Sequence, residues 1–539
     1  MKKIKVLLLA VYTNEMNEAM EEIGIAYIAA YLRENGFEVM LIGANINHIT
    51  YNKIVKFKPD IAGLTAYTIS REEVYSVCEK LRALIPDLHI CLGGLFPTYY
   101  HKEILKDNDN INSIARGEGE TVLLALAECL NNQDNLSCVK GLTYRQGANI
   151  YINEKQDIIE NMDKMPFPHK DMVVDNKLKH VLISTSRGCT SGCSFCVSRN
   201  YWGNWRGRSI SNIISEIKHI IKTYNITSFD FVDSSFEDPD PGCKRMIGIA
   251  EGIIKENIMI SYYAQMRADF CNKATPEIMN MLKKSGLCAV FLGIETANDA
   301  DRAIYNKRAT IEDNYRALEL FNQYNIAVSI GFINFNPYST FESLHANIAF
   351  LERYNYARFF DKLESRFIIY NNQTLLYERL LRDKLIKNAS DCFCFEYSFV
   401  DERIEKLSDF LTNYFDLVRK SARNYYGKLN NYNYMHINMI RQLYRRFDAL
   451  QDNSAYTVVR NHENDVNRVL THLNKVNNDW FCKLLELAKQ CWNENTARDI
   501  IDQALSKNNV NRMLEDLTKA KHELYENLMM IKPEYIKSL

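Results

Sequence analysis

The sequence predicts an α/β protein: a doubly wound, Rossmann-like fold, then a partial (β/α)6 barrel, then an α-helical domain. Three observations lead to this prediction. Short apolar runs alternate with amphipathic helical segments through residues 1–135, and the alternation resumes after residue 178. Near residue 400 it stops, and only helical periodicity follows. Such alternation builds parallel sheets whose faces are covered by helices.

The first region contains five predicted strands joined by helices. The strands are Ile4–Ala10, Phe37–Ile42, Asp60–Leu64, His89–Leu92 and Ile111–Arg116. The intervening helices are Glu22–Asn35, His48–Phe57 and Arg71–Ile85, with another ending near Cys129. Ile4–Ala10 follows a basic start and precedes the acidic Glu15, so we interpret it as a buried strand and not as an export signal.

The segments after three of these strands are rich in small and hydroxylated residues. They are Thr65-Ala66-Tyr67-Thr68, Gly93-Gly94 and Gly117-Glu118-Gly119-Glu120. Ligands of doubly wound sheets bind at the carboxyl ends of the strands, and small residues let a ligand approach the backbone. Each segment alone is explained equally well as an ordinary turn. Three of them on one edge favour a ligand groove.

A connector, Leu136–Leu178, separates the two β/α regions and contains a predicted hairpin around Arg145–Ala148. We therefore expect four parts. They are residues 1–135 (Rossmann-like domain), 136–178 (linker), 179–380 (partial barrel) and 381–539 (helical domain).

Three cysteines follow the first strand of the second region. The strand Val181–Thr185 leads to Arg187-Gly188 and then to Cys189, Cys193 and Cys196, spaced C-x3-C-x2-C. Three thiolates in one loop suit a [4Fe–4S] cluster with one iron left open. Zinc usually needs a second ligand pair, and none stands near. With 14 Cys and no export signal, we expect a reducing cytoplasm, where clustered cysteines favour metal chemistry over disulfides. We expect Cys392, Cys394, Cys482 and Cys491 to be buried thiols.

The remaining barrel strands each end in polar residues. The predicted strands are Phe229–Asp233, Ile258–Met266, Ala289–Ile294 and Ala327–Ile333, with a sixth in Phe359–Ile369. The polar ends are Asp233, Arg267, Glu295 and Asn334. In β/α barrels this edge is the catalytic face. For Asp233, for Glu295 and for Arg208, which follows the cysteine loop, a buried ion pair is the alternative explanation.

The C-x3-C-x2-C spacing, with Phe195 directly before the last cysteine, resembles the signature of the radical S-adenosylmethionine (SAM) superfamily. The resemblance implies that Cys189, Cys193 and Cys196 hold a [4Fe–4S] cluster and that SAM chelates the open iron. It implies further that SAM is cleaved to a 5′-deoxyadenosyl radical. By the same resemblance, the SAM contacts are Phe195, Arg208, Asp233, Arg267, Glu295 and Asn334.

The first region resembles the cobalamin-binding domain found in front of many radical SAM enzymes. The match rests on Gly24-Ile25-Ala26, on Gly93-Gly94 and on Gly117–Glu120. It implies cobalamin contacts at Thr65, Tyr67, Thr68, Gly93, Gly94 and Glu118. One departure concerns the loop Val11–Glu22, which contains no His. We therefore expect no imidazole ligand to cobalt from that loop.

Together the resemblances predict a cobalamin-dependent C-methyltransferase that acts on an unactivated carbon of a peptide or natural product. A radical rearrangement, cyclisation or ring contraction, with or without cobalamin, is the alternative, and a non-catalytic sensor ranks below both. We expect a reducing partner such as flavodoxin or ferredoxin. The 66 Lys+Arg and 67 Asp+Glu give a net charge of −1, which disfavours nucleic acid as a partner. No apolar run reaches the ~18 residues that span a membrane.

Overall fold

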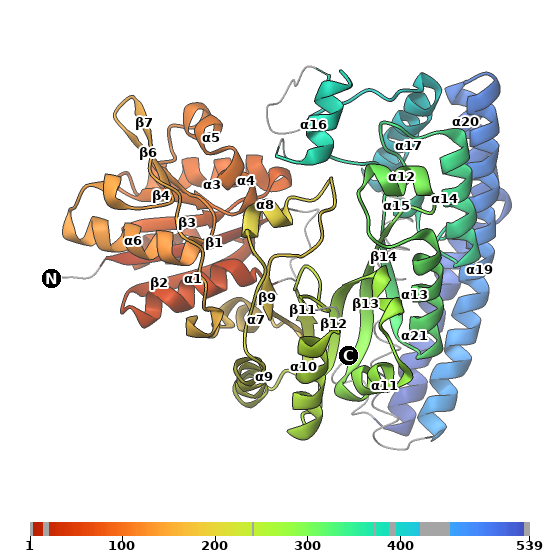
Figure 1. The fold of residues 1–539 in the computed structure, drawn as a ribbon, viewed down its shortest axis with the longest axis horizontal. Helices are drawn as coiled ribbons and strands as arrows, with labels where there is room; N and C mark the ends of the chain where they lie inside the picture. Colours follow the sequence, from red (N-terminus) through yellow and green to blue (C-terminus); the bar gives the residue numbers. More distant parts are fainter. Residues whose placement is uncertain are drawn as a thin grey trace. The chain divides into compact units, whose positions relative to one another are not determined.

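The chain folds into two compact units (Figure 1). The first comprises residues 1–190, 197–234 and 391–394, and the second comprises residues 191–196, 235–390 and 395–539. The computed structural model describes residues 4–13, 21–239, 242–369, 373–387, 395–420, 443 and 453–532.

The first unit is built on a seven-stranded sheet in the order β2-β1-β3-β4-β5-β6-β7. The strands are β1 (Lys5–Tyr12), β2 (Glu38–Asn45), β3 (Ile61–Thr65), β4 (His89–Gly93), β5 (Ser113–Ala115), β6 (Leu142–Gln146) and β7 (Asn149–Ile152). The first five strands are parallel, which confirms the predicted Rossmann-like fold. The predicted connector hairpin is β6–β7, and it extends the sheet in antiparallel fashion beyond β5.

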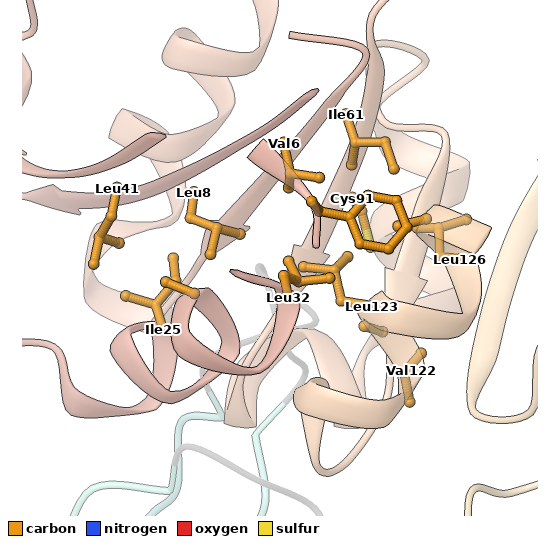
Figure 2. Packing of buried hydrophobic residues seen from close by; sticks show 14 of the residues in the cluster. Val6, Leu8, Ile25, Leu32, Leu41, Ile61, Cys91, Val122, Leu123 and Leu126 are labelled. Carbon is orange, nitrogen blue, oxygen red and sulfur yellow. The ribbon is translucent and has the colours of Figure 1, made fainter. Parts of the chain in front are cut away.

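Helices cover both faces of this sheet (Figure 1). They are α1 (Ile23–Glu34), α2 (Tyr51–Phe57), α3 (Arg71–Leu84), α4 (Leu95–Tyr99), α5 (His101–Asp107) and α6 (Gly119–Asn132). The core below α1 and α6 includes Leu8, Leu32 and Leu126, all nearly inaccessible (Figure 2). Gly63 of β3 is needed here, because a Cβ would come within 2.9 Å of Leu8 and 3.2 Å of Leu123. The near-continuous apolar run of β1 is typical of a strand buried on both faces.

The second β/α region continues the alternation in both units. In the first unit, β8 (Val181–Ile183) pairs in parallel with β11 (Ser228–Phe231), and β9 (Ser186–Arg187) pairs with β10 (Arg206–Gly207). This unit also holds α7 (Asp171–Asp175), α8 (Ser198–Trp202) and α9 (Ile210–Tyr224). In the second unit, β12 (Ser261–Arg267), β13 (Leu287–Glu295) and β14 (Ala327–Phe332) pair in parallel. The helices between and after them are α10 (Lys244–Lys255), α11 (Pro276–Ser285), α12 (Asp299–Ile304), α13 (Ile311–Gln323) and α14 (Phe341–Arg353).

The predicted sixth strand, Phe359–Ile369, forms only as a single parallel bridge after β14, in which the Phe335 amide donates to the Ser365 carbonyl at 2.9 Å and the Phe367 amide donates to the Phe335 carbonyl at 2.8 Å. Its first half forms the short helix α15 (Phe360–Leu363), and Arg366 makes only an isolated bridge to Phe335. The Phe360 ring packs against Phe415, with ring centroids 5.4 Å apart, and is almost fully buried. Tertiary packing of this aromatic residue outweighs the strand propensity of the apolar run.

The C-terminal residues that the structure describes are mostly helical, as predicted, apart from a stretch around the bridge between Ile386 and Tyr397. The helices are α16 (Leu375–Arg382), α17 (Glu402–Lys420), α19 (Asn453–Gln490), α20 (Glu494–Lys507) and α21 (Val510–Ile531). The amide of Asn474 donates to the Glu352 carbonyl near the end of α14 at 2.9 Å, and Asn477 donates to the Ala357 carbonyl at 2.9 Å. Within the described ranges, no helix has the length and apolarity that a membrane span requires.

Candidate functional site

A cavity of about 440 Å³ opens at the carboxyl ends of β3, β4 and β5 in the first unit. Five residues predicted from the strand ends line it: Thr65, Tyr67, Gly93, Gly94 and Glu118. Thr68, the sixth predicted contact, begins the short helix η2 (Thr68–Ser70) and does not line the cavity. The volume falls within the ~300–1,000 Å³ of small-molecule sites.

Glycines keep this cavity open. A Cβ on Gly24 or Gly117 would meet no protein atom within 4 Å, and one on Gly93 would meet only Ala115, at 3.8 Å and beyond. Side chains at these positions would therefore occupy the cavity instead of packing against protein. This cradle suits a bulky ligand that rests on the backbone at the sheet edge.

Two neighbouring glutamates line another part of the cavity wall. Tyr67 donates from its hydroxyl to Glu22 Oε2 at 2.7 Å, and burial raises the pKa of Glu22 above its ordinary value. Glu21 pairs with Lys170, whose Nζ lies 3.0 Å from Glu21 Oε1 and donates to the Leu182 carbonyl at 2.9 Å. Residues 14–20 of the preceding loop lie outside the described part of the chain. The expectation about cobalt ligation therefore stays a prediction.

A second buried network surrounds Arg187, the residue two positions before Cys189. Its guanidinium donates to Glu118 Oε1 at 2.5 Å and also to Glu120. Arg206 donates to Glu118 Oε2 at 2.9 Å, and the Ile159 amide donates to the same oxygen at 2.7 Å. Burial alone would raise the pKa of Glu118, but Arg187 and these hydrogen bonds bring it below its ordinary value. Both oxygens of Glu118 thus accept hydrogen bonds from protein groups.

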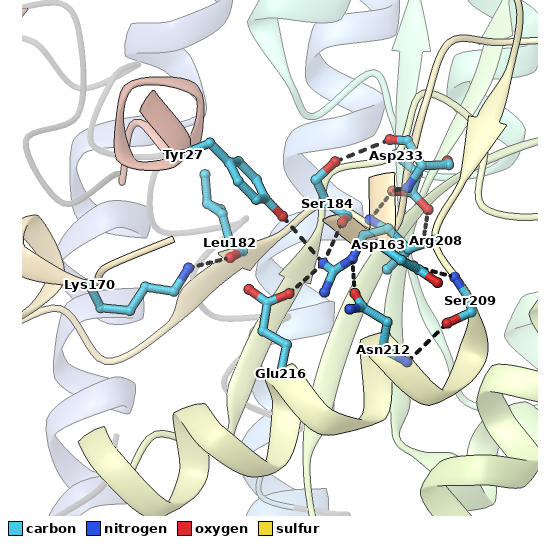
Figure 3. A network of polar contacts seen from close by, with 12 residues as sticks. Tyr27, Asp163, Lys170, Leu182, Ser184, Arg208, Ser209, Asn212, Glu216 and Asp233 are labelled. Atoms are coloured by element: carbon cyan, nitrogen blue, oxygen red, sulfur yellow. Dashed lines mark hydrogen bonds and ion pairs between the residues drawn. The ribbon is translucent and has the colours of Figure 1, made fainter. Parts of the chain in front are cut away.

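Asp233 and Arg208, two of the predicted SAM contacts, lie in a third buried network of the first unit (Figure 3). Asp233 Oδ1 accepts hydrogen bonds from the backbone amides of Thr185 (2.7 Å) and Ser186 (2.8 Å). Arg208 pairs with Glu216 of α9 and donates to the Ser184 carbonyl at 3.0 Å. Arg208 therefore forms the buried ion pair that the sequence left as an alternative, and Asp233 fixes the strand before the cysteine loop.

Arg267, at the end of β12 in the second unit, is held by acidic residues that the sequence interpretation missed. Its guanidinium donates to Asp238 Oδ1 at 2.8 Å and to Ser235 Oγ at 2.9 Å. Its backbone amide donates to Glu237 Oε1 at 3.0 Å, and burial raises the pKa of Glu237. The sequence does contain an indication of this site, because the acidic pair Glu237-Asp238 directly follows Ser235-Phe236. Asn334, at the end of β14, is buried and donates to the Leu363 carbonyl at 2.8 Å.

Glu295 ends β13 in a left-handed conformation, with φ of 69°. Its carboxylate lies 3.0–3.1 Å from where a Cβ would stand on Gly331 and 3.1 Å from one on Gly293. Lys307 Nζ lies 3.8 Å from Glu295 Oε1 and donates to the Gly293 carbonyl at 2.7 Å. The side chain of Glu295 is 13% exposed. The structure thus places a partly accessible carboxylate at the carboxyl end of a barrel strand.

The cysteine loop is divided between the units: Cys189 belongs to the first, and Cys193 and Cys196 belong to the second. Each is at least partly exposed, and none is in a disulfide. The prediction of a buried thiol is wrong for Cys491, which is exposed, and Cys482 is only partly buried. Cys392 and Cys394 lie outside the described residues. Among the residues described, no three His, Cys, Asp or Glu side chains gather closely enough for a single metal ion. A [4Fe–4S] cubane spaces its thiolates more widely than a single ion does. Three thiols in one loop are the donor set that this cluster needs.

The second-unit part of the loop is fixed by its backbone. Ser194 donates from its amide to the Tyr305 carbonyl at 2.9 Å and from its hydroxyl to the Ile304 carbonyl at 2.7 Å. Asn306 donates to the Gly192 carbonyl at 2.7 Å. The ring of Phe195 meets Tyr305 edge-on, with centroids 5.6 Å apart. These contacts order the loop without using either of its two thiols.

Comparisons with known proteins identify both regions. The B12 binding domain family matches residues 9–127, which include the strands at the cavity, and the Radical SAM superfamily matches residues 183–351, which include the three cysteines. The chain is a radical SAM enzyme with a B12-binding domain. The radical SAM domain brings SAM and a [4Fe–4S] cluster as cofactors, and the B12-binding domain brings cobalamin.

Relatives of this radical SAM enzyme carry the names of different reactions. This chain is 28% identical over 349 residues to the "uncharacterized methyltransferase PH0819" of Pyrococcus horikoshii. The match covers 62% of this chain and 74% of that protein. This chain is 27% identical over 324 residues to the anaerobic magnesium-protoporphyrin IX monomethyl ester cyclase of Rubrivivax gelatinosus. That match covers 57% of this chain and 58% of the cyclase.

Among solved structures, the cobalamin-dependent SAM radical enzyme OxsB, with aqua-cobalamin and SAM bound, superposes with a TM-score of 0.67 at 21% identity. The match covers 96% of this chain and 84% of OxsB. At this level of identity the likeness establishes a shared fold.

The first-unit cavity fits part of a cobalamin molecule. Glycines line its wall, and the Thr65 side chain also contributes to it. The cysteine loop fits a cluster with three protein ligands. Thr65, Tyr67, Gly93 and Gly94 line the cavity, and their contacts with cobalamin stay predictions. Glu118, Arg208 and Asp233 have protein partners in the structure, and their predicted cofactor contacts also stay predictions.

Proposed function

We propose that this radical SAM enzyme transfers a methyl group from methylcobalamin to an unactivated carbon of a small-molecule or peptide substrate. The glycine-lined cavity at the ends of β3–β5 carries this proposal, because methyl transfer of this kind requires bound cobalamin and a radical rearrangement does not. When bound, SAM and the cluster supply the adenosyl radical, and cobalamin supplies the methyl group. The relative named a methyltransferase is consistent with this reaction.

The protein's own part is to bind, orient and exclude water. Cys189, Cys193 and Cys196 hold three irons and leave one for SAM. Phe195, packed on Tyr305, covers the cluster loop. Glu295 keeps a carboxylate that is 13% exposed at the end of β13 and can contact SAM.

We also propose that the electron for SAM cleavage comes from a flavodoxin- or ferredoxin-type donor in the cytoplasm. The tested quantity is 5′-deoxyadenosine formation when a flavodoxin system replaces a chemical reductant. Formation at a comparable rate supports this donor class, and formation with the chemical reductant alone contradicts it.

A radical cyclisation is the second candidate, because one relative, at 27% identity, is named a cyclase. The two reactions differ in the fate of the SAM methyl group. A methyltransferase moves that methyl group to cobalamin, whereas a cyclase leaves it on methionine.

The test needs no substrate. Enzyme with a reconstituted cluster is incubated anaerobically with cob(I)alamin and SAM labelled in its methyl group, and methylcobalamin is quantified by absorbance and mass spectrometry. Labelled methylcobalamin formed faster than in an enzyme-free control supports methyl transfer. Cleavage of SAM to 5′-deoxyadenosine without labelled methylcobalamin favours the second candidate. Cys193→Ala enzyme is the control that lacks the intact cluster.

A further inference from the structure

Two glutamates in the wall of the cobalamin cavity face the protein interior. Glu118 and Glu120 follow β5, and the side chain of each is only 4% exposed. Arg187 pairs with both, and Arg206, on the strand paired with Arg187, contacts Glu118 as well. Two cations and two anions make the buried group neutral, and the two terminal nitrogens of the planar Arg187 guanidinium reach one glutamate each.

Arg187 has little freedom to move. Its side chain is 6% exposed, and its guanidinium lies 5.5 Å from the ring of Tyr27 and 5.2 Å from the ring of Trp202. Aromatic faces at this distance attract a cation and restrict its rotamers. The glutamates and the two rings together fix the end of the side chain.

The backbone from Arg187 to Cys189 is equally constrained. Gly188 has φ of +90°, and a Cβ there would meet Trp205 Cα at 3.1 Å and the Asn204 carbonyl oxygen at 3.2 Å. The chain therefore passes close against residues 204–205 in a conformation that only glycine adopts readily. Only Gly188 separates Arg187 from Cys189, and the close approach to residues 204–205 limits the path of the backbone between them.

We propose that Glu118 and Glu120 are positioning residues for the cluster, which act through Arg187 on Cys189, and that neither binds cobalamin. The wall of the cobalamin cavity thereby sets the position of one cluster ligand. This inference requires both cofactors but does not depend on methyl transfer, so it holds equally for a cyclase.

The test uses full-length Glu118→Gln and Glu120→Gln enzymes, with Glu22→Gln as the matched control. Glu22 lines the same cavity but its carboxylate bonds to Tyr67. Cobalamin affinity is measured by absorbance titration. The cluster is followed by iron release to a chelator and by the change in its electron paramagnetic resonance spectrum when SAM is added.

For Glu118→Gln and Glu120→Gln we expect unchanged cobalamin affinity and an altered response of the cluster spectrum to SAM. We also expect iron to be released ~10-fold faster, which is the smallest effect typical of losing a residue that orients a metal ligand. Glu22→Gln should leave both cluster readouts unchanged. Weakened cobalamin binding with an unchanged cluster would make Glu118 a cobalamin contact and overturn the proposal. If cobalamin affinity, iron release and the response to SAM were all unchanged, the network would have a role in folding only. That result would also overturn the proposal.

Glu118→Gln alone leaves an uncompensated buried cation and could prevent folding. The double variant Glu118→Gln with Arg206→Met keeps the network neutral while it removes the Glu118 partner of Arg187. The altered cluster readouts should persist in this variant. If the cluster readouts returned to wild-type values in the double variant, only the net charge of the network would matter. That result would contradict a positioning role for Glu118.

Discussion

At the scale of single residues, the carboxylate of Glu295 depends on two neighbours that have no side chain. A Cβ on Gly331 would stand 3.0 Å from Glu295 Oε2 and 2.9 Å from the ring of Phe291. We expect Gly331→Ala to displace the carboxylate and to weaken SAM binding as Glu295→Gln does. The loss of an interaction with a charged group predicts a ~10-fold higher Kd for SAM.

The Kd for SAM can be measured by equilibrium dialysis with the cluster assembled. Glu319→Gln is the control, since Glu319 is an exposed glutamate of α13 that pairs with Arg353. Unchanged SAM affinity in both Gly331→Ala and Glu295→Gln would return Glu295 to a structural role.

Each cluster cysteine should be indispensable. The loop offers three thiols for three of the four irons, so Cys189→Ala, Cys193→Ala or Cys196→Ala should abolish iron binding and 5′-deoxyadenosine formation. Cys491→Ala, at an exposed cysteine beyond α19, is the control. Full iron content in any of the three variants, together with normal 5′-deoxyadenosine formation, would refute the ligand assignment.

Burial lowers the pKa of His89 to about 4, against an ordinary value of 6.5. Its Nε2 lies 2.8 Å from Ser113 Oγ between β4 and β5. The unfolded chain binds the proton between these values and the folded protein does not. The free energy of unfolding is therefore at its full value above pH 6.5, where His89 is neutral in both states. It decreases as the pH falls toward 4, because only the unfolded chain takes up the proton.

This shift corresponds to about 2–3 kcal/mol of unfolding free energy between pH 6.5 and 4. We expect His89→Asn to reduce the slope of stability against pH in this range. Part of the slope should remain, because burial lowers the pKa of His101 to about 4 as well. Urea denaturation at several pH values measures the slope, and His472→Asn, on an exposed position of α19, is the control. An unchanged slope in the His89 variant would contradict the assignment.

The sequence could place site residues at strand ends but could not supply their partners. Glu295 and Thr65 follow apolar runs, so the alternation alone predicts which edge they occupy. Asp233 bonds to amides 47 and 48 positions away, and Arg187 bonds to glutamates 67 and 69 positions away. Such pairings depend on long-range packing that periodicity does not encode. Two arginines near the cysteine loop and two glutamates after β5 were nevertheless a visible charge match.

At the scale of elements, the end of α12 acts as a platform for the cluster loop. Asn336 is fully buried and donates to Asp301 Oδ1 at 2.8 Å and to the Tyr305 hydroxyl at 2.9 Å. We expect Asn336→Ala to cost about 2–3 kcal/mol of stability, because it leaves a buried carboxylate short of a donor. Since Tyr305 also holds Ser194, iron should be lost faster from the cluster.

Thermal unfolding and iron release to a chelator test this prediction together. Asn322→Ala, at an exposed position of α13, is the control. A destabilised variant that keeps wild-type iron release would show that the platform supports the fold and not the loop.

The sequence predicted helices and strands correctly where the hydrophobic alternation extended over many residues. It failed where contacts with distant residues determined the local structure. The five parallel strands of the first sheet were predicted to within a few residues. In Phe359–Ile369 the aromatic residues suited a strand equally well, and only their contacts with the C-terminal helices select α15.

At the scale of the whole molecule, the C-terminal helices belong to the second unit and share a core with its barrel part, where the ring of Phe481 lies 6.2 Å from that of Phe335. Trp480 is fully buried, and its ring lies 6.2 Å from Phe415 and 5.9 Å from Phe481. We expect Trp480→Ala to destabilise this unit by ~3–5 kcal/mol, as large cavities in a core do. Tyr456→Ala, at the exposed start of α19, is the control. Chemical denaturation measures the difference, and equal stability of the two variants would contradict a shared core.

The hairpin β6–β7 has a consequence for how the protein behaves at high concentration. Without it, β5 would end the sheet and offer its unpaired backbone to any passing strand. The hairpin moves that exposure to β7, a four-residue strand (Figure 1). The side chains of Tyr151 and Ile152 on this strand are 43% and 46% exposed. A strand this short is a poor template for another chain. The hairpin thus shields the strand that leads into Glu118 and Glu120 from self-association.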